Sequence, residues 1–140
     1  MNEALEKVKE RLDENNVKYI EDEDEIIINN YNDEIGMPIR YVIAAVETVK
    51  PTYRIVVISS SITKANNEIE MLKVINHLNN RESLIRYLIS DEKNIHVMSI
   101  NLSQIDVVAD DALTLLLCLD QDIAENYKDL MKSNWSEEVL

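Results

Sequence analysis

The side chains that could catalyse a reaction are few in this sequence. His77 and His96 are the only histidines, Cys118 is the only cysteine, and Ser59-Ser60-Ser61 is a run of serines. A nucleophilic enzyme would activate Cys118 or one of these serines with a histidine. Cys118 is flanked by leucines in an apolar stretch, which predicts a buried, unreactive thiol. The serines follow an apolar run, as in ordinary turns. We therefore predict no catalytic residue and no enzymatic activity.

Metal binding is the second chemistry to consider, because Glu21–Glu25 is a run of five acidic residues. An EF-type calcium loop spaces its ligands through a glycine to a distal Glu, whereas this run has no glycine and is followed at once by Ile26–Ile28. Two histidines cannot complete a catalytic zinc site without carboxylates or Cys118, and no H-E-x-x-H motif is present. We predict a solvated turn and no bound metal.

Paired carboxylates are the third possibility, and the last third of the chain contains Asp110, Asp111, Asp120 and Asp122. Such a pair can act as general acid and general base. Asp110 and Asp111 fall in the first turns of a predicted helix, where the helix dipole favours negative charge. This structural role is sufficient to explain them, so we predict no acid–base pair.

A single glycine and a net charge of −13 argue against several classes of ligand. Gly-rich loops that hold nucleotide phosphates need several glycines, since only glycine allows such close approach to the backbone. Nucleic acids and anionic membranes bind clustered Lys and Arg, which an acidic chain does not offer. We predict no cofactor, no nucleic acid and no membrane partner, although the charge would attract a basic partner.

The 140 residues, 46% of them hydrophobic and 29% charged, predict one globular domain over residues 1–140. One cysteine allows no intrachain disulfide. The N-terminus lacks the basic flank and apolar run of a signal peptide, and no apolar run approaches the ~20 residues of a membrane span. These features predict a cytoplasmic protein.

The elements that must position these residues begin with a helix and a meander. Apolar residues at helical spacing predict a first helix ended by Asn15-Asn16, since Asn tolerates the left-handed conformation. Ile39–Thr48 is rich in β-branched residues, although Ala44-Ala45 leaves a helix as its alternative. The strands are expected at Val17–Ile20, Ile26–Ile28, Ile39–Thr48 and Tyr53–Ile58, with a polar stretch over Asn29–Glu34 and a turn at Gly36-Met37-Pro38.

Two more helices are predicted. Asn67, with Glu70 three residues on, resembles a capping box, and Asn79-Asn80 ends the helix. Its apolar set is Ile69, Leu72, Ile75 and Leu78. The last helix follows Ser103–Asp106, and Trp135 beyond it is expected to dock on the body of the domain in preference to a partner. The apolar side of this last helix is expected to contain Ala109, Leu113, Leu116, Leu117, Ile123, Ala124, Tyr127, Leu130 and Met131.

Between these helices lies a hairpin with apolar residues on both faces. Its strands are Leu84–Ile89 and Ile95–Leu102, joined by the polar turn Ser90–Asn94. A half-solvated antiparallel strand should alternate apolar and polar residues, so this hairpin needs a second cover. Either the domain or a protein partner supplies that cover, and we favour a partner. The candidate protein or dimer interface comprises Leu84, Ile85, Tyr87, Leu88, Ile89, Val97 and Met98.

The order α-β-β-β-β-α-β-β-α predicts an α+β fold with an antiparallel sheet and helices on one face. The opposite sheet face would then be uncovered, which favours a homodimer or a second polypeptide there. Along the hairpin, Leu84, Arg86 and Leu88 alternate with Ile85, Tyr87 and Ile89, so one of these sets points away from the helices.

The sequence resembles the YbjN family of bacterial sensory-transduction regulators, whose fold is similar to that of type III secretion chaperones. In the family a leucine-rich helix ending in Asn precedes a strand, an acidic turn and a strand that runs to a Leu. One departure is the lack of glycine in the acidic turns, where Asn94 could supply the left-handed residue. The matching segments here are Val17-Lys18-Tyr19, Leu72–Asn79, Ile85–Leu88, Asp91-Glu92 and Ile95–Leu102.

The resemblance implies a non-enzymatic domain, since proteins of the similar chaperone fold are dimers that hold extended segments of other polypeptides. We therefore expect a protein-binding domain with a chaperone-like or regulatory role. The alternative is a small-molecule or metal-responsive sensor with a pocket between the sheet and the helices.

Overall fold

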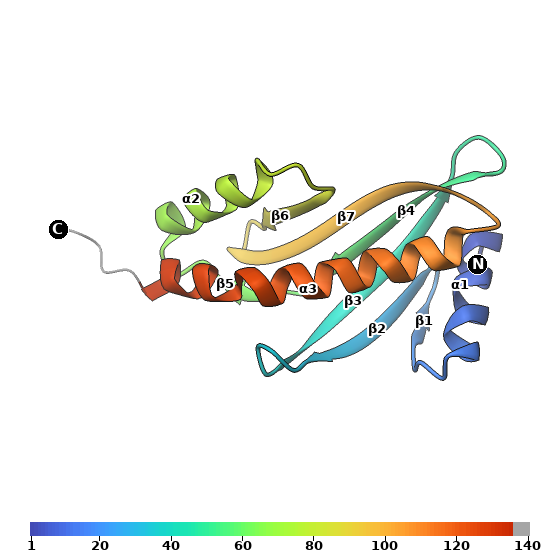
Figure 1. The fold of residues 1–140 in the computed structure, drawn as a ribbon, viewed down its shortest axis with the longest axis horizontal. Helices are drawn as coiled ribbons and strands as arrows, with labels where there is room; N and C mark the ends of the chain where they lie inside the picture. Colours follow the sequence, from blue (N-terminus) through green and yellow to red (C-terminus); the bar gives the residue numbers. More distant parts are fainter. Residues whose placement is uncertain (136–140) are drawn as a thin grey trace.

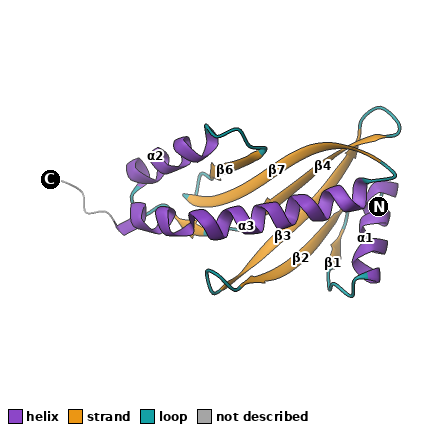
Figure 2. Ribbon diagram, in the orientation of Figure 1, coloured by secondary structure: helices purple, strands orange, loops and turns teal. Residues whose placement is uncertain are grey.

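The chain folds into one curled antiparallel sheet with three helices, which confirms the predicted α+β class. The computed structural model describes residues 1–135. Helix α3 runs along the length of the sheet, with α1 beside its first turns and α2 beside its last (Figures 1 and 2). The elements are α1 Glu3–Glu14, β1 Ile20–Asp22, β2 Glu25–Asn32, β3 Met37–Glu47, β4 Thr52–Ser59, β5 Thr63–Lys64, α2 Glu68–Asn79, β6 Ile85–Ile89, β7 Asn94–Gln104 and α3 Val108–Trp135.

The sheet holds seven strands in the order β1-β2-β3-β4-β7-β5, and β6 also pairs with β7. The long strand β7 lies between β4 and β6 in the sheet. It pairs with β4 over residues 98–104 and with β6 over residues 95–99. The short strand β5, which the sequence pattern did not indicate, pairs with the start of β7. Ile39–Thr48 forms a strand, not the alternative helix.

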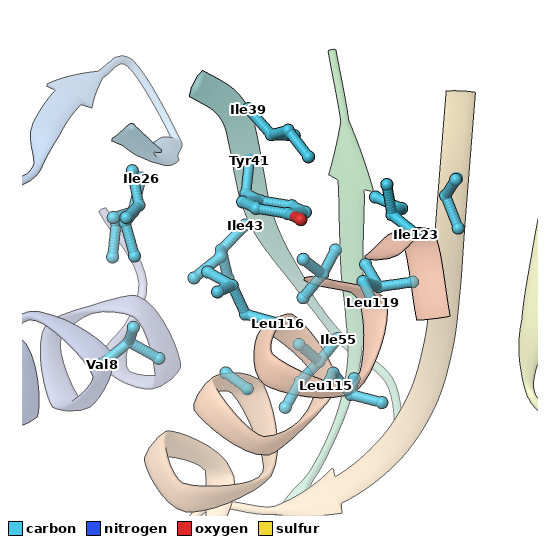
Figure 3. Packing of buried hydrophobic residues seen from close by; sticks show 14 of the residues in the cluster. Val8, Ile26, Ile39, Tyr41, Ile43, Ile55, Leu115, Leu116, Leu119 and Ile123 are labelled. Atoms are coloured by element: carbon cyan, nitrogen blue, oxygen red, sulfur yellow. The ribbon is translucent and has the colours of Figure 1, made fainter. Parts of the chain in front are cut away.

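The hydrophobic core lies between α3 and one face of the sheet. Alternate residues of the central strands point into it, as the period of two requires. Figure 3 shows side chains of α3 meeting those of β3 and β4 in one layer. The largest fully buried side chains include Tyr41, Ile43, Ile55, Leu119 and Ile123.

Asparagine caps begin both short helices, and an asparagine ends the first. The Asn2 side chain accepts a hydrogen bond from Leu5 N, and the Asn67 side chain accepts one from Glu70 N, which confirms the predicted cap of α2. Asn16 has φ 56°, so the predicted left-handed stop of the first helix is also confirmed.

Strand β2 is longer than the apolar run Ile26–Ile28 predicted, since Asn29–Asn32 continue it. The reason is that the asparagines on its helix-facing side have partners on α3. Asn30 Nδ2 donates to Asp120 Oδ2 at 3.0 Å, and Asn32 Nδ2 donates to the Asp120 carbonyl oxygen at 3.0 Å. A polar strand is stable against the core when each buried amide is satisfied.

Parts of the predicted helix faces were wrong. On α3, Leu117 is 66% exposed, whereas Leu119, absent from the predicted apolar side, is fully buried. Cys118 is exposed, so the expectation of a buried thiol was also wrong. On α2, Met71 is buried, whereas Ile69 and Leu72 are exposed. Simple apolar spacing did not identify which leucines the curled sheet covers.

Three local predictions also need correction. The first strand begins at Ile20, not Val17, and the turn that follows it is centred on Glu23, with φ 51°. In the β6–β7 turn the left-handed residue is Lys93 and not Asn94. The Trp135 side chain is 76% exposed, so it does not dock on the domain, and Ser136–Leu140 lie outside the described residues.

Among residues 1–135, the helices include none with the length and apolar character needed to cross a membrane.

Candidate functional site

The sheet face that points away from α3 is broadly apolar, and we call it the open sheet face. On β3, β4 and β7 the residues that alternate with the core residues lie on this face. Ile100 is 44% exposed, Val46 55% and Leu102 61%. The open sheet face comprises the apolar residues Ile20, Ile27, Val42, Ala44, Val46, Val56, Ile58, Leu88, Met98, Ile100 and Leu102.

The strand register arranges these residues in rows across the sheet. The first row crosses six strands from β1 to β6 in the order Ile20, Ile27, Val42, Ile58, Met98 and Arg86. The second row is Asp22, Glu25, Ala44, Val56 and Ile100. The third row is Val46, Arg54 and Leu102. The first row is apolar except for Arg86 at its β6 end, the second is apolar from β3 to β7, and Arg54 interrupts the third. Apolar rows of this kind are typical of a surface that contacts protein.

Three arginines, Arg40, Arg54 and Arg86, project from this face without an ion pair among residues 1–135. Arg40 Nε donates to Asn29 Oδ1 at 3.1 Å, and Arg86 binds the carbonyl oxygens of Ser83 and Ile85. The chain has 27 acidic residues against 14 basic ones, so carboxylates are in excess, yet none within residues 1–135 forms an ion pair with these three arginines. The part of the open sheet face from β3 to β6 is thus locally basic on an acidic protein.

The β1–β2 end of the same face is acidic. Asp22 and Glu25 are directly opposite each other in the register, and both are exposed. Like charges placed opposite across two strands are destabilising. No cation within residues 1–135 forms an ion pair with either carboxylate.

The structure divides the predicted interface residues into two sets. Tyr87 and Val97 are buried in the core, and Ile85 and Ile89 pack against it, so these four point toward the helices. Leu88 and Met98 lie on the open sheet face, and Leu84 precedes β6 with an exposed side chain. The set Leu84, Arg86 and Leu88 therefore points away from the helices.

The outer edge of β6 is closed by side chains. Asn79 at the end of α2 accepts from Tyr87 N at 2.7 Å and donates to the Tyr87 carbonyl oxygen at 2.9 Å, as a neighbouring strand would. Ile85 N donates to the Ser83 hydroxyl at 3.1 Å. Because these backbone groups are already satisfied, strand addition at this edge is disfavoured.

Asp120 and Asp122, considered above as a catalytic pair, instead connect α3 to the sheet. Asp120 Oδ1 accepts a hydrogen bond from the Tyr41 hydroxyl at 2.6 Å, and Asp122 Oδ2 accepts one from the Tyr87 hydroxyl at 2.8 Å. Arg81 forms two parallel hydrogen bonds with Asp122, at 3.1 and 3.0 Å, which raise the pKa of its guanidinium. Burial, and then the hydrogen bonds that the two tyrosine hydroxyls donate to Asp120 and Asp122, raise the pKa of Tyr41 and Tyr87 well above the ordinary value.

The two tyrosines predict a loss of stability in alkali. Their raised pKa means that the folded state keeps both protons while the unfolded chain releases them above pH ~10. The contribution of the two protonated tyrosines to the free energy of unfolding is fully present below pH ~10 and decreases as the pH rises toward the pKa of the folded state. The free energy of unfolding should fall by up to about 1.4 kcal/mol per pH unit for each tyrosine. Urea unfolding at several pH values measures it, and the double variant Tyr41→Phe/Tyr87→Phe should have a shallower slope than the parent protein.

The other residues considered above for catalysis or metal binding form structural hydrogen bonds or lie at helix ends. His96 Nδ1 is 3.0 Å from the Ser59 carbonyl oxygen, and the Ser59 hydroxyl accepts from Val97 N at 2.9 Å. Asp110 and Asp111 lie in the first turn of α3, as predicted. Residues 1–135 contain no group of three or more His, Cys, Asp or Glu side chains able to hold a metal ion.

A broad hollow of about 1050 Å³ adjoins the open sheet face at its β1 end. It lies between the chain that leaves α1 and the outer residues of β2, so it is not the predicted pocket between sheet and helices. Its lining mixes apolar and charged residues, namely Asp13, Asn16, Val17, Lys18, Tyr19, Ile20, Glu21, Ile27 and Asn29.

The sequence matches no family model and no curated protein. Its structure is similar to the crystal structure of YbjN from E. coli, described there as a proposed transcription regulator, with a TM-score of 0.55. The two share 9% sequence identity, and the alignment covers 89% of this chain and 91% of YbjN. The similarity extends over nearly the whole of both chains, and at this identity it shows that the chain has a YbjN-like fold.

Proposed function

We propose that this chain is a non-enzymatic protein-binding domain with a regulatory or chaperone-like role, and that the open sheet face is the surface that contacts another polypeptide. The single observation that carries the proposal is the set of contiguous apolar rows on a face that no helix covers. The structural neighbour is described as a regulator, which is compatible with this role.

The face is favoured over a sheet edge as the binding surface. The edge at β6 has its backbone groups bonded by Asn79 and Ser83, and β1 at the other end is only three residues long. An extended segment that pairs with an edge gains affinity from a row of free backbone groups, which neither edge supplies at length. Side chains packed on the open sheet face would instead bury apolar area.

A site-specific photo-crosslinker tests the proposal. Introduced at Ile100 on the open sheet face of the full chain in cells that express it, the crosslinker should give covalent adducts with polypeptide. The control is Leu117, which is more exposed than Ile100 but lies on α3, on the opposite side of the sheet. Adducts at Ile100 and not at Leu117 support the proposal. Equal labelling at both positions, or none at Ile100, Val56 and Leu102, would contradict it.

A further inference from the structure

We propose that the partner on the open sheet face is an acidic amphipathic α-helix of another polypeptide, lying along β4 and β7 between Arg40 and Arg86. The inference rests on the proposed function, which assigns the face to a polypeptide, and it adds the charge and the conformation of that polypeptide. The net charge of −13 by itself favours a partner of the opposite charge, a basic one.

Cations without a counterion are concentrated on this face. The three arginines are joined by Lys64 of β5, which also forms no ion pair among residues 1–135. The Thr63 hydroxyl accepts from Asn134 Nδ2 of α3, so the Lys64 side chain points away from α3. From β3 to β6, none of the described residues on this face is Asp or Glu. Such a surface is complementary to an acidic partner.

Covering these arginines without carboxylates would be strongly unfavourable. A guanidinium stays charged at any ordinary pH and has five N–H donors, and most of these donors have no protein acceptor on this face. A charge that is buried without a partner is far less stable than one in water. Charges more than about 8 Å apart are largely screened at physiological salt, so at contact distance the local arginines outweigh the net charge of the chain.

The backbone of the partner favours a helix over an extended segment. A segment that lies face-on against apolar side chains loses water from its backbone N–H and C=O groups, and an extended segment regains these bonds only by pairing with a strand. The edge of β6 is already bonded by Asn79 and Ser83, and β1 is three residues long. A helix satisfies its own backbone and lays an apolar stripe on the surface. This differs from the extended segments that the resembled chaperone fold implies.

The positions of the arginines fit such a helix. Arg86 is in the same row as Val42 but three strands away, so their backbones are about 14 Å apart across the sheet, and a helix with its side chains is about 10–12 Å wide. Arg40 lies one row before Val42, and Arg54 lies two rows beyond it. The resulting 20 Å or so along the strands is the length of roughly 14 helical residues. Carboxylates on the two flanks would then meet Arg40 and Arg86, and one near an end would meet Arg54.

The apolar centre between the arginines matches the stripe of this helix. Val56 is opposite Ile100, and Ile58 is opposite Met98, in the two rows beneath the proposed position of the helix. Apolar residues at i, i+3, i+4 and i+7 span about 10 Å along a helix, which is enough to cover both rows. The Ile100 side chain is 44% exposed, so a partner can bury much of it.

Fluorescence anisotropy with labelled synthetic peptides tests the charge and the conformation of the partner. Two peptides of about 18 residues carry the same leucines at helical spacing, with Glu on the flanks of one and Lys on the flanks of the other. The full-length wild type should bind the Glu peptide at least about tenfold more tightly than the Lys peptide. A Glu peptide with proline at its centre should bind at least about tenfold more weakly, because proline breaks a helix but fits an extended segment.

Charge reversal makes the test specific to the three arginines. The triple variant Arg40→Glu/Arg54→Glu/Arg86→Glu changes exposed side chains only, and it should lose the Glu peptide and prefer the Lys peptide. The control is Lys128→Glu, an exposed lysine on α3 that also forms no ion pair among residues 1–135, and it should leave both affinities within about twofold. Circular dichroism establishes that each variant is folded.

Four results would each overturn the inference. They are a wild type that prefers the Lys peptide, equal binding of the proline peptide, a triple variant that keeps the wild-type preference, and no binding of the Glu peptide at about 1 mM.

The outcomes also separate this inference from the proposed function. Crosslinks from Ile100 to another polypeptide, together with no binding of the Glu peptide, keep the proposed function and reject the acidic helix. Crosslinks from Ile100 that contain only this chain make a second copy the occupant and reject the acidic helix as well. No crosslinks from Ile100, Val56 or Leu102 contradict the proposed function, whatever the peptides show.

Discussion

Replacing Leu119 with Ala is expected to lower the free energy of unfolding by about 3 kcal/mol. Leu119 is fully buried near the middle of α3, where side chains of the helix meet those of β3 and β4 (Figure 3). Truncation removes buried methyl groups and leaves a cavity that a packed helix and sheet cannot fill, and such changes cost about 2–5 kcal/mol. Urea or guanidinium unfolding monitored by circular dichroism measures the change.

The control for this prediction lies two residues away on the same helix. Leu117→Ala makes the same chemical change at a 66% exposed position, so the free energy of unfolding should change by less than about 0.5 kcal/mol. Because both variants have the same helix propensity change, their difference isolates burial. Equal effects of the two substitutions would mean that α3 presents a different face to the sheet.

Much of this fold could be predicted from the sequence because its local signals agree with its tertiary structure. Asn67 begins α2 because its side chain accepts a hydrogen bond from Glu70 N, and Asn16 ends the turn after α1 because asparagine tolerates a positive φ. The face of α3 is different. Leu115, Leu116, Leu117 and Leu119 are all leucines within one turn and a half, and only the position of the sheet decides which of them is buried.

The same limit applies to the open sheet face. The apolar pattern of the hairpin predicted correctly that one of its sets points away from the helices, but alternation alone assigns no direction. Tyr87 decides it, because its hydroxyl reaches Asp122 across the core and fixes the odd-numbered residues of β6 toward α3. Arg86 was named in advance as a member of one hairpin set, whereas Arg40 and Arg54 were missed, and so was the grouping of all three arginines on one face. Arg40, Arg54 and Arg86 are far apart in the sequence, and only the strand order brings them onto one surface.

Within the core, the contact between Asp122 and its two partners is expected to contribute nearly as much as a large apolar side chain. Asp122→Ala should lower the free energy of unfolding by about 3 kcal/mol. The change leaves the buried Tyr87 hydroxyl without its carboxylate acceptor and Arg81 without its counterion. Removing one partner of a buried, hydrogen-bonded charge pair costs about 3–5 kcal/mol, and the partly exposed Arg81 side chain places this case near the lower end.

A second substitution distinguishes the pair from the loss of side-chain volume. Arg81→Met keeps an apolar chain of similar length, so the double variant Asp122→Ala/Arg81→Met should be less destabilised than the sum of the single changes by about 1 kcal/mol or more. Asp129→Asn, an exposed carboxylate on the same helix, should change stability by less than about 0.5 kcal/mol. Strict additivity in the double variant would show that Arg81 and Asp122 are not coupled. In that case Tyr87 alone would hold this end of β6 against α3 through its hydroxyl, and Tyr87→Phe would then account for most of the loss seen with Asp122→Ala.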